Sequence, residues 1–89
     1  MNEDNYDFMN FLMSVNEEYI KARKKFPEMA SPHEGYAIIK EELDELWDFI
    51  KANEGASIVA SEEVKQIAAM CLAYYLEIIV VSKLREDEL

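Results

Sequence analysis

The spacing of apolar residues is the feature of this sequence that most restricts its fold. In the first third of the chain they recur at alternating steps of four and three residues: Phe8, Leu12, Val15, Tyr19, Ala22 and Phe26. Such spacing places all of them on one face of an amphipathic helix. We therefore predict a first helix from about Asp4 to Lys25. Nowhere does the sequence alternate with the two-residue period of a strand, which indicates an all-α protein.

The end of this first helix carries a concentration of positive charge. Its last turns contain Lys21, Arg23, Lys24 and Lys25. Cations are favourable there because the C-terminal end of a helix dipole is negative. Pro27 follows, and because proline has no amide hydrogen to donate, the helix cannot continue through it.

The segment from Ser31 to Glu34 predicts where a second helix begins. Ser31 can accept a hydrogen bond from the Glu34 amide, and the Glu34 carboxylate can reach back to the Ser31 amide. Pro32 occupies the first helical position, where its missing donor has no cost. The helix is expected to end near Asn53 and Gly55, a plausible C-cap region. Its main apolar stripe consists of Tyr36, Ile39, Leu43, Leu46 and Ile50.

A third helix is predicted in the last third of the chain. Ser57 or Ser61 can cap it, and Ile58 and Val59 can form a short extra turn in front of it. The stretch from Val64 to Val81 is apolar nearly all round. Two charges and a glutamine interrupt it, so the uninterrupted apolar run is too short to span a bilayer. We therefore expect a helix packed on several sides and no membrane association.

Size and composition together predict an oligomer. The chain has 89 residues, which we expect to form one domain, residues 1–89. A chain this short buries only about 60 to 65% of its extended surface when it folds alone. Yet 51% of its residues are hydrophobic, more than a small monomer can easily cover. We expect three main helices forming a bundle with a four-helix-type core that is completed in a homodimer or homotetramer.

The net charge limits the partners that the chain can bind. It has 19 Asp and Glu residues against 9 Lys and Arg, giving a formal net charge of −10. Such a field repels nucleic acid polymers and anionic membranes, whereas a small polyanion can still bind together with divalent cations. The acidic N-terminal sequence has neither the basic nor the apolar region of a secretory signal, so we expect a cytoplasmic protein.

Two pairs of polar residues at helical spacing predict a metal site. Glu42 and Glu45 lie three residues apart in the second helix, as do Glu63 and Gln66 in the third, so each pair shares one helix face. If the two helices pack antiparallel, the four side chains can meet. Three carboxylates and one amide oxygen suit Mg²⁺, with Mn²⁺ as a second possibility.

A solvated acidic face is the alternative interpretation of these glutamates. Against it, Glu42 and Glu45 continue the line through Ile38 and Phe49, two large apolar residues that favour a partly buried position. Carboxylates held together in a partly dry site repel one another, and their pKa values rise unless a cation compensates. A bound cation is the more favourable solution.

Two stretches carry a resemblance to a known family. They are SPHEGYAIIKEELDELWDFIK (Ser31 to Lys51), which follows Lys25-Phe26-Pro27, and EEVKQIAAMCLAY (Glu62 to Tyr74). The region from about Lys25 to Tyr75 resembles the short MazG-like nucleotide pyrophosphohydrolases of phages and bacteria, within the all-α NTP pyrophosphatase superfamily. The resemblance implies a dimeric or tetrameric helical bundle. It also implies Mg²⁺ bound through EExxE and ExxD motifs, and hydrolysis of (deoxy)nucleoside triphosphates to monophosphate and pyrophosphate.

The resemblance also implies roles for particular residues. By position, Glu42 and Glu45 supply metal ligands from EExxE, and Glu41 is a supporting carboxylate or base. Glu63 matches the first residue of ExxD. Gln66 stands in the place of the motif's aspartate, which removes one negative charge from the site.

Further residues are candidates for catalysis and substrate binding. Glu41 or Glu45 can orient or deprotonate the attacking water. Lys40 and Lys65 are candidates to contact phosphate, and Trp47 to stack on a base; the alternatives are ordinary surface lysines and a core aromatic. The expected function is Mg²⁺-dependent removal of unwanted nucleotides, a housekeeping role. The alternative is a non-catalytic helical dimer that acts as a binding or regulatory module.

Overall fold

The chain is almost entirely helical. The computed structural model describes residues 3–88, and no strand occurs within that range. The elements are α1 (Glu3–Lys25), α2 (Pro32–Lys51), α3 (Ile58–Tyr74), the π-helical segment η1 (Tyr75–Val80) and α4 (Val81–Glu88). The predictions of an all-α chain and of three main helices are confirmed. The third predicted helix continues beyond Val81, through η1 and α4.

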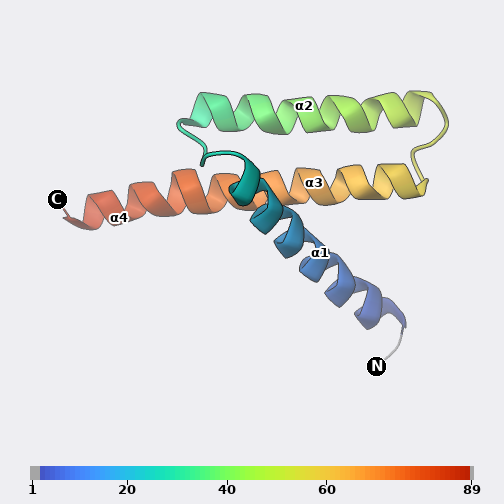
Figure 1. Ribbon diagram of the computed structural model, residues 1–89, viewed down its shortest axis with the longest axis horizontal. Coiled ribbons are helices and arrows are strands. Elements are labelled where there is room, and N and C mark those ends of the chain that lie inside the picture. Colours follow the sequence, from blue (N-terminus) through green and yellow to red (C-terminus); the bar gives the residue numbers. More distant parts are fainter. Residues whose placement is uncertain (1–2, 89) are drawn as a thin grey trace.

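The helices form an open arrangement with two layers (Figure 1). α2 and α3 lie side by side and run antiparallel, while η1 and α4 continue the line of α3. The C-terminal end of α1 packs against α3, and the N-terminal half of α1 points away from the α2 and α3 pair. The end of α1, the linker after it and the two antiparallel helices therefore meet in one region.

The start of α2 follows its predicted capping pattern with one difference. The Ser31 hydroxyl accepts a hydrogen bond from the Glu34 amide at 3.1 Å, and Pro32 is the first helical residue. The sequence predicted that the Glu34 carboxylate accepts from the Ser31 amide. The carboxylate instead accepts from the Ala30 amide at 3.2 Å. The Ala30 amide precedes the helix and has no helical carbonyl to bond, so the carboxylate satisfies it.

The end of α2 is a Schellman motif centred on Asn53. This residue has a φ of 62°, in the left-handed region that asparagine tolerates better than most residues. The Asn53 amide donates to the Ile50 carbonyl at 3.1 Å, and the Glu54 amide donates to the Phe49 carbonyl at 2.8 Å. Of the two residues in the predicted C-cap region, Asn53 and not Gly55 takes the left-handed conformation.

Ser57 is the residue that caps α3. Its hydroxyl accepts from the Ala60 amide at 3.2 Å, which makes Ile58 and Val59 the first turn of the helix. From Ile58 to Leu84 the helical rod is long and apolar enough to cross a bilayer by length and composition. It is longer than the stretch from Val64 to Val81 that the sequence predicted to be too short. Core helices of soluble proteins pass the same test, but they are mostly buried, whereas 17% of this apolar window is buried in the single chain. The absence of membrane association therefore stays a prediction.

Gly35 sets the distance between α2 and α3. It is buried in the first turn of α2, where a Cβ atom would lie 2.6 Å from the Tyr74 ring and 3.1 Å from the Met29 sulfur. A contact of 2.6 Å is essentially never seen for a real Cβ atom, and one of 3.1 Å is tighter than nine in ten. The glycine therefore permits a close approach of the two helices that carry the predicted metal ligands.

The core of the single chain is small. The buried hydrophobic residues are Val15, Met29, Ala60, Ala69 and Ala73, and no large side chain among the described residues is fully buried. The accessible surface is 6905 Å², whereas a compact protein of this mass exposes about 5,400 Å². The radius of gyration is 15.2 Å, against about 12 Å for a compact chain of this length. The chain alone leaves much apolar surface uncovered.

Candidate metal centre

The antiparallel pairing of α2 and α3 brings three glutamates together. Glu42, Glu45 and Glu63 each offer one carboxylate oxygen, and these oxygens lie within 4.8 Å of one another. Glu63 is only 7% exposed, Glu42 is half-buried and Glu45 is exposed. The cluster could therefore hold a metal ion between the two helices. The predicted convergence of these three residues is present.

Two carboxylate oxygens of the cluster are buried without the hydrogen bonds that such oxygens need. Oε1 of Glu63 and Oε2 of Glu42 are buried, and neither has a hydrogen-bond partner in the described part of the chain. Burial, together with the neighbouring Glu42 and Glu45 carboxyl groups, raises the pKa of Glu63 to about 8. Glu63 is therefore protonated at neutral pH. A divalent cation would coordinate the two oxygens that lack partners. It would also favour the ionised form of Glu63, which would then release its proton.

A cavity of about 610 Å³ adjoins the cluster. It lies where α1, the linker and the antiparallel helices meet, and Glu42 both lines it and belongs to the cluster. This volume is within the usual range for sites that bind small molecules. Its charged and polar lining residues are Glu18, Lys21, Arg23, Lys25, Glu34, Glu41, Glu42 and Gln66.

The structure separates the roles predicted for the remaining polar residues of the two motifs. Glu41 is exposed and lines the cavity, whereas Glu45 belongs to the cluster and is not among the lining residues. Gln66 is half-buried and lines the cavity beside Glu42. Glu41 is thus the predicted base that has access to a ligand in the cavity. A place for Gln66 among the metal ligands stays a prediction.

Lys40, Lys65 and Trp47 lie elsewhere. Lys40 forms an exposed ion pair with Asp44 at 3.0 Å, and this partner raises the lysine's pKa. Lys65 pairs with Glu62 at 3.1 Å. Trp47 is 55% exposed. None of the three lines the cavity, and their predicted contacts with phosphate or base stay untested.

The cations that do line the cavity belong to α1. They are Lys21, Arg23 and Lys25, which the sequence analysis placed only at the favourable end of a helix dipole. A cluster of four cations directly before a helix-ending proline was the available signal. Their place opposite α2 depends on the crossing of α1 over α3, which local sequence patterns do not specify.

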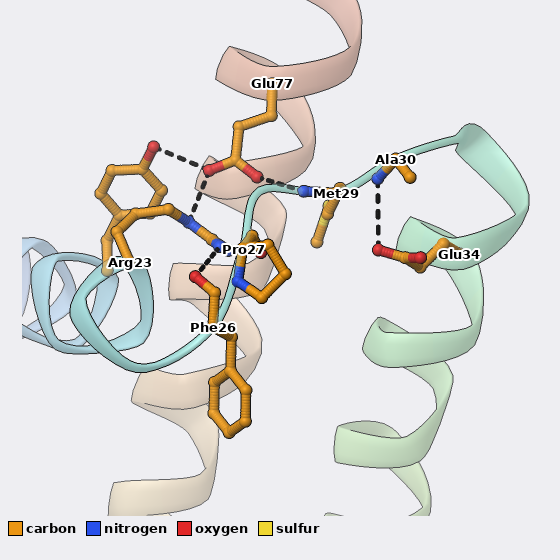
Figure 2. Close-up of polar contacts among 8 residues, drawn as sticks. Arg23, Phe26, Pro27, Met29, Ala30, Glu34 and Glu77 are labelled. Carbon is orange, nitrogen blue, oxygen red and sulfur yellow. Dashed lines mark hydrogen bonds and ion pairs between the residues drawn. The ribbon is translucent and has the colours of Figure 1, made fainter.

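A second buried glutamate, Glu77, fixes the end of α1 (Figure 2). It reaches from η1 to the linker and α1, and is 7% exposed. Its Oε2 lies 2.7 Å from Nε of Arg23 and accepts a hydrogen bond from the Tyr19 hydroxyl at 2.8 Å. Its Oε1 accepts from the Met29 amide at 2.9 Å. Burial and the hydrogen bond to Glu77 raise the pKa of Tyr19.

Arg23 continues this network to the backbone of the linker. Its Nη1 donates to the Phe26 carbonyl at 3.1 Å and also to the Pro27 carbonyl (Figure 2). These carbonyls follow the end of α1, where the helix itself supplies no donors. Glu77 and Arg23 together therefore fix the path of the chain along one side of the cavity.

The arrangement is suited to binding a divalent cation together with a small ligand. Oxygen ligands gathered at one side of a cavity are the donor set that Mg²⁺ and Mn²⁺ prefer.

Comparisons of the chain with models of protein families, with curated proteins and with solved structures found no match.

Proposed function

We propose that this protein is a Mg²⁺-dependent nucleoside triphosphate pyrophosphohydrolase, which converts (d)NTP to (d)NMP and pyrophosphate. The observation that carries the proposal is the cluster of Glu42, Glu45 and Glu63, with two orphaned oxygens beside a cavity of about 610 Å³. The resemblance of the segment from Lys25 to Tyr75 to MazG-like enzymes gives the reaction class. The role would be removal of unwanted nucleotides in the cytoplasm.

The cluster fits Mg²⁺, and Mn²⁺ is the alternative ion. Glu42, Glu45 and Glu63 would hold the ion, with the Gln66 amide oxygen as a further ligand. When bound, the ion supplies charge neutralisation for the triphosphate and polarisation of the phosphorus that is attacked. Glu41 lines the cavity and accepts the proton of the attacking water, with Glu45 as the other candidate base.

The uncovered surface supports the proposal that the bundle is completed by a second chain. The single chain exposes about 1,500 Å² more than a compact protein of its mass. A standard interface removes about 800 Å² from each partner, and obligate dimers remove more. Exposed apolar side chains on α1 would supply such an interface in a homodimer or homotetramer: Phe8, Met9, Leu12 and Met13.

Pyrophosphate release tests the proposed reaction. The purified protein is incubated with a panel of NTPs and dNTPs with and without Mg²⁺. We expect release that requires Mg²⁺ and is lost in Glu42→Gln and Glu63→Gln. Glu62→Gln is the matched control, because Glu62 neighbours Glu63 but is exposed and pairs with Lys65 outside the cluster. No release from any nucleotide, with no rise in melting temperature on adding Mg²⁺, would refute the proposal.

One observation favours a second function, a non-catalytic helical dimer that acts as a binding or regulatory module. The cavity beside Glu42 presents the neutral Gln66 where the MazG-like motif has a carboxylate. A site with one negative charge fewer can retain an ion without turning over substrate. A rise in melting temperature with Mg²⁺, without pyrophosphate release from any nucleotide, would identify this module.

A further inference from the structure

We propose that the α1 wall of the cavity, formed by Lys21 and Lys25, binds the phosphate chain of an oligophosphate that is complexed with the metal ion. The inference rests on the proposed function and extends it to residues outside the two acidic motifs. It assigns the metal ion and the phosphate contacts to different helices that line one cavity. Glu42 and Gln66 lie on the metal side, and the two lysines lie on α1.

Three cations of α1 line the cavity, and they differ in the groups that already neutralise their charge. Arg23 is committed to the buried Glu77 and to two linker carbonyls. Lys21 has an exposed side chain and a loose ion pair with Glu18 at 3.5 Å. Lys25 has no carboxylate within 4.0 Å in the described part of the chain. Lys25 is therefore the main group available to an anionic ligand, and Lys21 is the second.

The balance of charge around the cavity explains why the ligand must arrive with a metal ion. Glu18, Glu34, Glu41 and Glu42 line the cavity together with the three cations of α1. A bare oligophosphate would meet more negative than positive charge there, in a protein of net charge −10. A divalent cation at the glutamate cluster makes this side of the cavity less negative and offers phosphate oxygens a direct ligand position. The lysines can then contact phosphate oxygens that the metal does not occupy.

The α1 wall is also held in place well enough to position a ligand. Glu77 and Arg23 fix the linker through Met29, Phe26 and Pro27 directly after Lys25 (Figure 2). A cation at the end of a freely moving helix would lose entropy on each binding event. The buried network removes much of that loss for the backbone that carries Lys25.

The test measures binding of inorganic tripolyphosphate by isothermal titration calorimetry, with and without Mg²⁺. The wild-type protein is expected to bind tripolyphosphate only with Mg²⁺. The double variant Lys21→Ala/Lys25→Ala is expected to bind it about tenfold or more weakly, since two charge-assisted contacts are lost. Lys24→Ala is the matched control, because Lys24 is an exposed lysine of the same helix turn that does not line the cavity. It should change the affinity less than twofold.

The outcomes separate this inference from the proposed function. If the double variant binds tripolyphosphate as the wild type does, while Glu42→Gln abolishes binding, the inference is overturned and the metal site stands. Equal losses in Lys24→Ala and the double variant also overturn it, because they indicate a general charge effect. A nucleoside triphosphate in the same titration identifies the source of the phosphate chain. If the nucleoside triphosphate binds more tightly than tripolyphosphate, the ligand is a nucleotide. If it binds equally or more weakly, the result argues against the proposed reaction, whereas the role of the α1 wall is upheld.

Discussion

Glu63 and Glu77 lie on the same helical rod, and each is 7% exposed, but their surroundings are opposite. Glu77 is surrounded by donors: the Arg23 guanidinium, the Tyr19 hydroxyl and a backbone amide. Glu63 faces the carboxyl groups of Glu42 and Glu45, and one of its buried oxygens has no partner in the described structure. The chain supplies a cation to one buried glutamate and withholds it from the other.

The difference separates a buried charge that the fold neutralises from one that it leaves without a partner cation. A buried carboxylate costs free energy unless donors or a cation compensate. At Glu77 the protein supplies a cation and two hydrogen-bond donors, and the result is a fixed connection between α1, the linker and η1. At Glu63 compensation must come from outside the chain, as an ion or a proton, so the site responds to the solution around it.

The largest effect is expected from Glu77→Ala. This change leaves the Arg23 guanidinium in a largely buried position without its counter-charge, and the Met29 amide without its acceptor. Breaking such a pair lowers the free energy of unfolding by about 3–5 kcal/mol. Urea unfolding at a fixed protein concentration measures it. A loss below about 1 kcal/mol would mean that the network is not a structural connection, and the comparison with Glu63 would fail.

The pH dependence of the metal-free protein should report Glu63. Its pKa is about 8 in the folded state against an ordinary value of 4.5, so between these values the folded state binds more protons than the unfolded state. Stability therefore falls as pH rises through this window, by about 3 kcal/mol from pH 5 to pH 8. Melting temperatures across this range measure the fall.

Saturating Mg²⁺ should reduce this pH dependence. The ion displaces the proton of Glu63, so binding at pH 7 releases up to one proton. Calorimetric titrations with Mg²⁺ in buffers of different ionisation enthalpy count the protons released. A melting temperature of the metal-free protein that stays constant between pH 5 and pH 8 would contradict the raised pKa of Glu63.

Glu63→Gln and Glu77→Gln should have effects of opposite sign. At pH 8 the glutamine at position 63 removes repulsion from Glu42 and Glu45, and we expect the metal-free protein to gain about 2 kcal/mol. The same change at position 77 removes the counter-charge of Arg23 and is expected to destabilise. Thermal unfolding of both variants, with and without Mg²⁺, provides the comparison. Destabilisation by Glu63→Gln would mark Glu63 as structural.

The smallest effect is expected from Gln66→Asp. A carboxylate at this position adds negative charge near the cluster and should tighten Mg²⁺ binding by about 1 kcal/mol, or fivefold to tenfold. Calorimetric titration with Mg²⁺ measures the change. Gln66→Glu is a useful second variant, because it adds the same charge on a longer side chain. Unchanged affinity in both variants would place Gln66 outside the shell of metal ligands.

Local rules explain the parts of the structure that the sequence predicted. The cap at Ser31, the cap of α3 at one of two candidate serines, the end of α1 before Pro27 and the shared face of Glu42 and Glu45 each depend on residues within one or two turns. The meeting of these glutamates with Glu63 needed one further assumption, antiparallel packing of α2 and α3. A short connection between two helices makes that packing the simplest arrangement.

The parts that were missed depend on contacts distant in sequence. Glu77 was recognised only as a charge that interrupts an apolar stretch, because its partners Tyr19, Arg23 and Met29 are at least 48 residues away. The π-helical turn at η1 has no distinct sequence signature. The position of Lys21 and Lys25 at the cavity depends on how α1 crosses α3. A lone charge within an apolar helix was the signal that could have indicated a buried partner.

Gly35 has a consequence for the choice of ion. It lies two turns before Glu42, and a Cβ atom at this position would lie 2.6 Å from the Tyr74 ring. A larger residue there would act as a wedge between the helices and lengthen the span that a bound ion must bridge. Calcium prefers longer ligand distances than magnesium and tolerates irregular geometry. If the cluster holds an ion as proposed, its selectivity would depend on a residue that has no side chain with which to touch the ion.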